Sequence, residues 1–273
     1  MTNELVPTFG TTTVRGITLA FTELGEGPTV FSLHGLSSSR ASAARVGLTD
    51  YSPVAEAGFR LISYDARGHG ESTGTGDPAD YLWSNLADDL FAVADHLAPG
   101  ETFSAIGLSM GTGTILTAAS VDQSRFDRLV LTAPPTIWQT RAGQAAMYAQ
   151  MVEVVENSSP DALAALFAAS PVPEMFTDVA GFASTPDISD ELLTTVFRGA
   201  GMTDLPSEDA IASITRPTLL LPWSTDPGHP VSSAEKLHTL IHGSELEIAT
   251  TVDAVHGWGA RAAAFLAAGR DAA

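Results

Sequence analysis

Short apolar runs bounded by turn residues recur along the chain and alternate with helix-length segments. Such runs are typical of strands that are buried on both faces of a sheet. The predicted strands cover residues 11–14, 17–21, 29–33, 60–64, 103–106, 129–132, 218–221 and 246–249. Helices are predicted at residues 41–57, 81–97, 112–120, 232–242 and 258–268. This alternation predicts right-handed crossovers and an α/β fold with a mostly parallel sheet of about eight strands, flanked by helices.

One long interval breaks the alternation. From Pro134 to Thr215 the sequence shows no convincing strand. An uninterrupted helical excursion of this length between neighbouring strands is unusual, although ordinary connecting helices packed on the sheet are the alternative. We therefore expect a helical cap at residues 135–215, inserted between strands 6 and 7, on a core of residues 1–134 and 216–273. The helical stretches predicted within the cap are residues 140–156, 160–169, 189–198 and 207–214.

The overall composition limits the possible partners. The chain has 273 residues, of which 44% are hydrophobic and 16% charged, enough apolar material for a large core. Its net charge of −19 repels nucleic acids and anionic membrane surfaces. The N-terminus lacks a basic region followed by an apolar run, and no stretch is long and apolar enough for a membrane span. We therefore expect a cytoplasmic monomer or homodimer that acts on a small molecule, with no nucleic-acid or membrane partner.

The chain contains no cysteine, so disulfides, thiolate metal sites and a cysteine nucleophile are excluded. His238 and His242 have the i,i+4 spacing of a metal-binding pair on a helix, but they lack the His-Glu-x-x-His pattern. An exposed helix face explains these two residues better. We expect neither a metal nor a cofactor.

The pentad Gly107-Leu-Ser-Met-Gly111 directly follows an apolar strand and directly precedes a helix-forming run. A Gly-x-Ser-x-Gly sequence in this context is typical of a nucleophile elbow, in which a sharp strand-to-helix turn exposes the serine side chain. The two glycines leave room for backbone that passes close on either side. This placement identifies Ser109 as the candidate nucleophile.

A nucleophilic serine needs a base that takes its proton and a carboxylate that orients the base. Of the seven histidines, we select His256 as the base because it lies between the last strand and the last helix. We attribute the other six histidines to structural roles. Asp226 follows the strand at residues 218–221 and is the preferred acid. Asp253 is the rival, but it precedes His256 by only three positions, which makes an approach across the imidazole ring awkward.

With these residues the chain resembles an α/β-hydrolase fold protein of the cap-bearing serine esterase and lactonase type. The segments 33–36 and 64–72 resemble the family's His-Gly loop and its Asp-x-Arg-Gly-His-Gly-x-Ser turn. The resemblance implies that the backbone N–H groups of Leu36 and Met110 form an oxyanion hole. It also implies that His34 and the 65–72 turn belong to the scaffold.

The resemblance and the nature of the cap together suggest a substrate class. Serine at the elbow points to acyl transfer, whereas haloalkane dehalogenases and epoxide hydrolases of this fold carry aspartate there. The cap is rich in aromatic residues and methionine, with only Arg141 and Arg198 as cations, which favours a neutral, apolar carboxylic ester or lactone. Either arginine is a candidate for binding one carboxylate. The alternatives are a carbon–carbon bond hydrolase acting on vinylogous diketones and a receptor-like, ligand-binding member of the fold. The candidate substrate-binding residues are Trp138, Tyr148, Met151 and Phe176.

Overall fold

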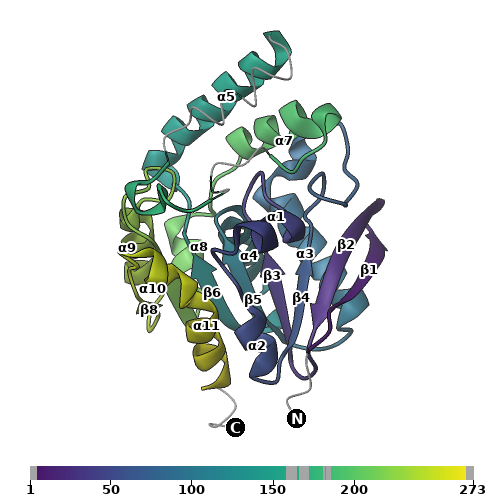
Figure 1. Cartoon of the computed structure of the whole chain (residues 1–273), viewed down its shortest axis with the longest axis vertical. Helices are drawn as coiled ribbons and strands as arrows, with labels where there is room; N and C mark the ends of the chain where they lie inside the picture. Colours follow the sequence, from purple (N-terminus) through teal and green to yellow (C-terminus); the bar gives the residue numbers. More distant parts are fainter. Residues whose placement is uncertain (1–4, 158–164, 166–171, 181, 183–185, 269–273) are drawn as a thin grey trace.

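The computed structural model describes residues 5–157, 165, 172–180, 182 and 186–268. Its centre is an eight-stranded sheet with the strand order β1-β2-β4-β3-β5-β6-β7-β8 (Figure 1). The strands are β1 Thr8–Val14, β2 Ile17–Leu24, β3 Thr29–Leu33, β4 Arg60–Tyr64, β5 Phe103–Leu108, β6 Phe126–Thr132, β7 Thr218–Leu221 and β8 Glu245–Leu246. The predicted fold class is therefore confirmed.

The sheet is antiparallel at one edge and parallel elsewhere. β2 runs antiparallel to both β1 and β4, whereas all neighbouring pairs from β4 to β8 are parallel. Leu33 on β3 lies opposite Gly107 on β5, and Leu108 lies opposite Thr132 on β6. Because parallel strands end at the same edge, the loops after β3, β5 and β7 converge there.

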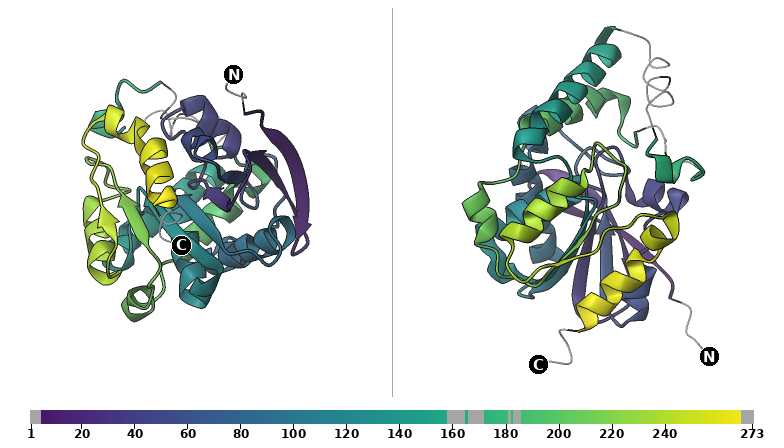
Figure 2. Two further views of the ribbon diagram at one scale, coloured as in Figure 1. Left: turned by 90° about the horizontal axis from the view of Figure 1, so that it is seen from below. Right: turned by 90° about the vertical axis from the view of Figure 1, so that its left-hand side faces the viewer.

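Helices cover both faces of the sheet (Figure 2). In the described part of the chain, no helix is both long and apolar enough to cross a membrane. The α-helices are α1 Arg40–Val46, α2 Ser52–Glu56, α3 Trp83–Leu97, α4 Met110–Asp122, α5 Arg141–Asn157, α7 Asp190–Met202, α8 Glu208–Ala212, α9 Val231–Leu240, α10 Val252–His256 and α11 Trp258–Ala267. Single 3-10 turns occur at Pro78–Tyr81, Gln123–Arg125, Trp138–Thr140 and Glu174–Phe176.

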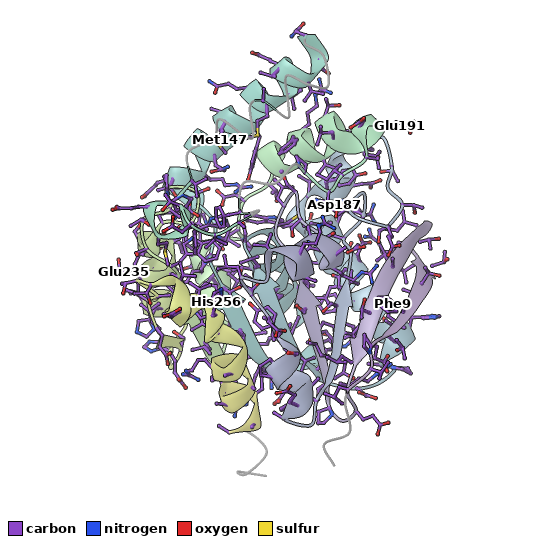
Figure 3. All side chains as sticks on the ribbon, in the orientation of Figure 1. Phe9, Met147, Asp187, Glu191, Glu235 and His256 are labelled. Carbon is purple, nitrogen blue, oxygen red and sulfur yellow. The ribbon has the colours of Figure 1, made fainter. Side chains whose placement is uncertain are left out.

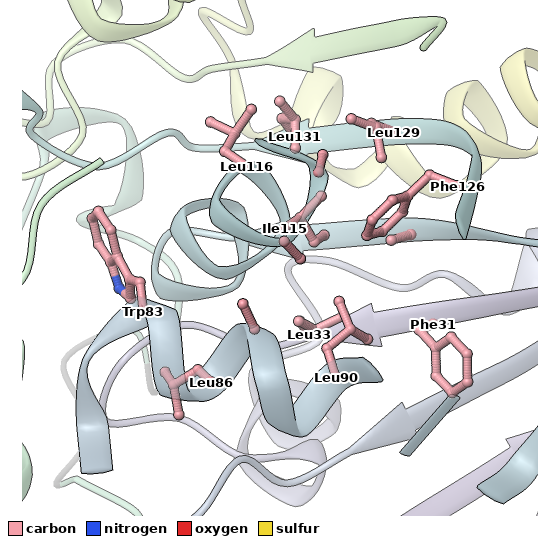
Figure 4. Packing of buried hydrophobic residues seen from close by; sticks show 14 of the residues in the cluster. Phe31, Leu33, Trp83, Leu86, Leu90, Ile115, Leu116, Phe126, Leu129 and Leu131 are labelled. Carbon is pink, nitrogen blue, oxygen red and sulfur yellow. The ribbon is translucent and has the colours of Figure 1, made fainter. Parts of the chain in front are cut away.

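The core lies on both sides of the sheet because successive strand residues point to opposite faces. On β3, Phe31 packs in a cluster with α3 and α4, whereas its neighbour Val30 packs in a second cluster with α2 and α11. Figure 4 shows the first cluster, in which Leu90 of α3 and Ile115 of α4 lie among the strand residues. Burial on both faces explains why the strands read as continuous apolar runs.

One predicted helix is divided in the structure. Residues 41–57 form the two short helices α1 and α2. Gly47 ends α1 with a φ of 64°, a conformation that glycine adopts without strain, and donates its N–H to the Ala43 carbonyl. Pro53 then stands in the first turn of α2, where its missing N–H has no cost. The prediction at 160–169 lies outside the described residues except for residue 165.

Between β6 and β7 the structure describes α5, α7 and α8. Helices α5 and α7 lie beyond the edge of the sheet at which the parallel strands end. Figure 1 and the right-hand view of Figure 2 show α5 projecting above the rest of the molecule. The segment before α7 contacts the core loops: Gly70 N–H donates to the Asp187 carbonyl at 2.8 Å, and Asp187 N–H donates to the Ser37 carbonyl at 2.8 Å. The division into a core and a cap at residues 135–215 remains our proposal.

Two buried histidines support the loops under this edge. The rings of His34 and His69 lie 5.2 Å apart, and His69 Nδ1 donates to the Arg67 carbonyl at 2.9 Å. Burial, assisted by the nearby His34, lowers the pKa of His69 to about 3. Burial also lowers the pKa of His34, although its hydrogen bond to the Gly35 carbonyl and the Asp65 and Asp187 carboxylates oppose the change. Both imidazoles are therefore neutral in the folded protein near neutral pH.

Neutral burial of His69 predicts a loss of stability in mild acid. Its folded pKa lies below the unfolded value of 6.5, so the stabilisation is fully present above pH 6.5 and is lost as the pH falls toward 3. We expect His69 to account for about 2 kcal/mol of the loss in free energy of unfolding between pH 7 and pH 5. His69→Asn keeps a donor for the Arg67 carbonyl and should show a shallower pH dependence in denaturant titrations.

His96→Asn is the matched control because His96 is exposed. It should retain the wild-type pH dependence. An unchanged slope in His69→Asn would show that His69 is not the group responsible.

Candidate active site

Ser109 occupies the sharp turn between β5 and α4. Its backbone has φ 52° and ψ −105°, a conformation that residues other than glycine rarely adopt. A Cβ added at Gly107 would lie 2.5 Å from backbone carbon of Gly111, and one added at Gly111 would lie 2.4 Å from the Leu33 carbonyl oxygen. Both positions therefore require glycine. Ser109 N–H donates to the Thr132 carbonyl at 3.1 Å, which holds the turn against the end of β6.

The histidine beside this serine is His229. Its Nε2 lies 2.8 Å from Ser109 Oγ, and its Nδ1 lies 2.8 Å from Asp226 Oδ2. Because a carboxylate only accepts, Nδ1 carries the proton and Nε2 is free to accept the hydrogen of the serine hydroxyl. Ser109, His229 and Asp226 thus form a continuous chain of two hydrogen bonds.

Asp226 is held by its own loop. Its Oδ1 accepts the Gly228 N–H at 2.8 Å, and its Oδ2 accepts the indole N–H of buried Trp223 at 2.9 Å as well as the His229 hydrogen bond. Burial opposes ionisation, but the interactions with His229, Trp223 and Gly228 outweigh it and lower the pKa of Asp226 to about 2. The group is consequently a carboxylate near neutral pH and keeps the imidazole in the required tautomer.

The structure does not bring His256 to this site, and the prediction of His256 as the base is corrected. Residues 252–256 form α10 instead of a loop, because Thr251 caps the helix by accepting the Ala254 N–H at 3.2 Å. The His256 side chain is exposed on this helix (Figure 3), and no hydrogen bond to Ser109 or Asp226 is found for it within the described residues. The rival acid Asp253 is exposed on the same helix.

The sequence contains a signal for His229. A spacing of three residues between acid and base argues against the pair Asp253 and His256, yet Asp226 and His229 have the same spacing. The difference is the turn between them. The Asp226 carboxylate accepts the Gly228 N–H, and His229 N–H donates to the Asp226 carbonyl at 3.2 Å, so that the loop folds back and the two side chains meet.

A cavity opens beside Ser109, and Leu36 and Met110 both line it. Met110 is the first residue of α4, where backbone N–H groups have no partner within the helix. Neither the Leu36 nor the Met110 N–H donates to a loop carbonyl or a side chain in the described part of the chain. These two amides therefore fit the predicted oxyanion hole.

Of the four cap residues predicted to bind substrate, only Tyr148 lines this cavity. Trp138 packs on the core, and its indole N–H donates to the Pro206 carbonyl at 3.0 Å. Met151 is buried between α5 and α7, and Phe176 packs edge-on against Trp223. These three side chains pack within the protein. The sequence does not reveal this, because apolar side chains that pack against the sheet are indistinguishable in sequence from those that contact a ligand.

Comparison with known proteins identifies the family. The family model described as the alpha/beta hydrolase fold matches residues 28–248. The chain belongs to this family.

Individual similar proteins give a less uniform picture. An epoxide hydrolase from Caballeronia sordidicola is 29% identical over 139 residues, which are 51% of this chain and only 40% of that protein. A hydrolase structure from Pseudomonas aeruginosa PA01 has a TM-score of 0.77 at 23% identity and covers 97% of this chain and 99% of its own. The esterase EaEST from Exiguobacterium antarcticum has a TM-score of 0.74 at 23% identity, with 94% and 98% covered. At this identity the structural similarity shows the fold.

Trp223 offers a test of the hydrogen bonds around Asp226. Trp223→Phe removes the indole donor and should lower kcat about tenfold with little change in KM, because Trp223 positions the acid and does not line the cavity. Steady-state kinetics on a short-chain ester measure both constants.

Trp258→Phe is the matched control. Trp258 stacks on Trp223 with ring centroids 5.4 Å apart, so this variant makes a similar loss of volume without removing a donor to Asp226. Equal losses of kcat in the two variants would mean that packing, and not the hydrogen bond, explains the effect.

Proposed function

We propose that this protein is a hydrolase that cleaves a carboxylic ester or lactone through an acyl-enzyme on Ser109. The observation that carries the proposal is the chain of two 2.8 Å hydrogen bonds from Ser109 Oγ through His229 to Asp226. This arrangement has the geometry in which imidazole takes the proton of an attacking serine.

The first half of the reaction forms the acyl-enzyme. Ser109 Oγ attacks the carbonyl carbon of the ester while His229 Nε2 takes its proton, and the ionised Asp226 stabilises the imidazolium that results. The negative charge that develops on the carbonyl oxygen is stabilised by the N–H groups of Leu36 and Met110. His229 then returns the proton to the leaving alkoxide as the carbon–oxygen bond breaks.

The second half releases the acid. His229 takes a proton from water, the hydroxide attacks the acyl carbon, and the proton passes to Ser109 Oγ as the acyl–oxygen bond breaks. For a lactone the alcohol stays attached to the acid product. The same residues therefore serve both kinds of substrate.

The lining of the cavity supports an apolar acyl group. Aromatic side chains of Tyr81, Trp83 and Tyr148 form part of its wall. These surfaces favour an apolar acyl chain. Serine at the elbow distinguishes this site from the aspartate nucleophile expected for epoxide hydrolysis, so we do not carry that activity over from the Caballeronia sordidicola relative.

Covalent labelling tests the nucleophile directly. A fluorophosphonate should label Ser109 in the wild type, and Ser109→Ala should abolish labelling and lower kcat for p-nitrophenyl butyrate by ~10⁴ or more. Peptide mass spectrometry and absorbance kinetics are the measurements.

Ser213→Ala, at an exposed serine after α8, is the control and should label and react like the wild type. Labelling that survives in Ser109→Ala would contradict the assignment. Poor ester turnover with rapid cleavage of a vinylogous diketone would instead identify a carbon–carbon hydrolase, and stoichiometric binding without turnover a receptor.

A further inference from the structure

Arg141 places a cation in the wall of the cavity beside Ser109. The residue is 6% exposed and lines the same cavity as Ser109. The only other basic residue in the segment 135–215 is Arg198, which is far more exposed and forms an ion pair with Glu156 at 2.5 Å. The mechanism described above leaves Arg141 without a role.

The partners of Arg141 are neutral. Its Nε donates to the Thr203 carbonyl at 2.9 Å, and its Nη2 donates to the Ala200 carbonyl at 2.7 Å, both at the C-terminal end of α7. The guanidinium also donates to the hydroxyl oxygen of Tyr148. The guanidinium carbon also lies 4.6 Å from the centre of the Trp83 ring. Within the described residues, no carboxylate lies within ion-pair distance of the Arg141 guanidinium.

This charge is therefore only partly compensated. Burial lowers the pKa of Arg141, against the opposing influence of Tyr148 and of the exposed Asp204. Arginine nevertheless stays protonated in proteins, so the site keeps a full positive charge in a poorly solvated place. Helix carbonyls and aromatic faces supply partial negative charge only. A carboxylate entering the cavity would supply the missing counter-charge.

We propose that Arg141 binds a carboxylate group carried by the substrate. This inference rests on the proposed function, and it makes the substrate a monoester of a short dicarboxylic acid or a lactone that carries a free carboxylate. The apolar chain would lie against Trp83 and Tyr148, with the scissile carbonyl at Ser109 and the free carboxylate at Arg141. The sequence favours a neutral substrate and leaves Arg141 and Arg198 as candidates for binding one carboxylate, and the proposal assigns that carboxylate to Arg141.

The net negative charge of the protein does not explain a preference for an acidic substrate. With a net charge of −19 the surface does not concentrate anions, so a preference for an acidic substrate has to arise inside the cavity. Arg141 can provide that preference, because charge-assisted hydrogen bonds to a guanidinium are stronger where water is excluded.

The experiment compares substrates of the same shape that differ in charge. Wild-type enzyme is assayed on the monoethyl esters of succinic, glutaric and adipic acid and on the corresponding ethyl esters with a terminal primary amide. We expect kcat/KM for the best acid to exceed that of its amide about tenfold to a hundredfold. NMR of the released ethanol measures both rates without a chromogenic leaving group.

Variants assign the preference to Arg141. Arg141→Gln should remove the preference for the acid, and Arg141→Lys should retain part of it because the charge remains. Arg198→Gln is the matched control in the same segment and should keep the wild-type ratio. Because Arg141 also caps α7, circular dichroism checks the fold of each variant, and the ratio between the two substrates cancels a general loss of activity.

Each outcome decides the proposal. Equal kcat/KM for acid and amide in the wild type overturns it, and so does a preference that persists in a folded Arg141→Gln variant. If Arg141→Gln does not fold, the wild-type ratio and its reduction in Arg141→Lys decide. If no ester is hydrolysed, calorimetry of the acid and amide esters binding to Ser109→Ala separates the two proposals. Tighter binding of the acid supports the Arg141 site, although the hydrolase function fails. Equal binding of the two esters overturns the Arg141 site.

Discussion

The hydrogen bond between His229 Nδ1 and Asp226 Oδ2 is the interaction on which the rest of the site depends. It fixes the tautomer in which Nε2 can accept the serine proton, and it closes one loop after β7 so that acid and base come from the same strand end. The positions of Ser109 and His229 then depend on the ends of two strands, β5 and β7, which are separated by the single strand β6. Neighbouring strands are ~4.8 Å apart, so two strand spacings are a distance that the side chains of Ser109 and His229 can bridge.

Two charged side chains near this edge of the sheet, the half-buried Asp226 and the buried Arg141, are compensated in different ways. Asp226 is compensated by three N–H donors, from Trp223, Gly228 and His229, which all belong to β7's own loop. Arg141 receives only neutral partners. A buried charge is costly unless an opposite charge or hydrogen bonds compensate it. Asp226 forms hydrogen bonds and, once His229 is protonated, an ion pair within its own loop, whereas Arg141 has hydrogen bonds but no carboxylate within ion-pair distance in the described part of the chain. The two residues therefore have different relations to the substrate: Asp226 acts through His229, and Arg141 is proposed to contact the substrate itself.

The strands and the serine turn could be predicted from the sequence because their physical causes are local. Runs such as Thr29–Leu33 are apolar on both faces, and the glycines at 107 and 111 are required by close backbone contacts. The base could not be assigned in the same way, since it depended on whether a loop folds back on itself. His256 was favoured by its position before the last helix, but a helix that Thr251 caps carries it into solvent. The division of residues 41–57 at Gly47 is also local, because glycine adopts the positive φ that ends α1.

The role of His229 is tested most directly by comparing two histidine variants in a single-turnover assay of p-nitrophenolate release. His229→Ala should slow acylation of Ser109 by ~10⁴ or more, because the proton acceptor at 2.8 Å is lost. His256→Ala alters an exposed side chain and should leave the rate within about twofold of the wild type. A large loss in His256→Ala together with an active His229→Ala variant would contradict the account.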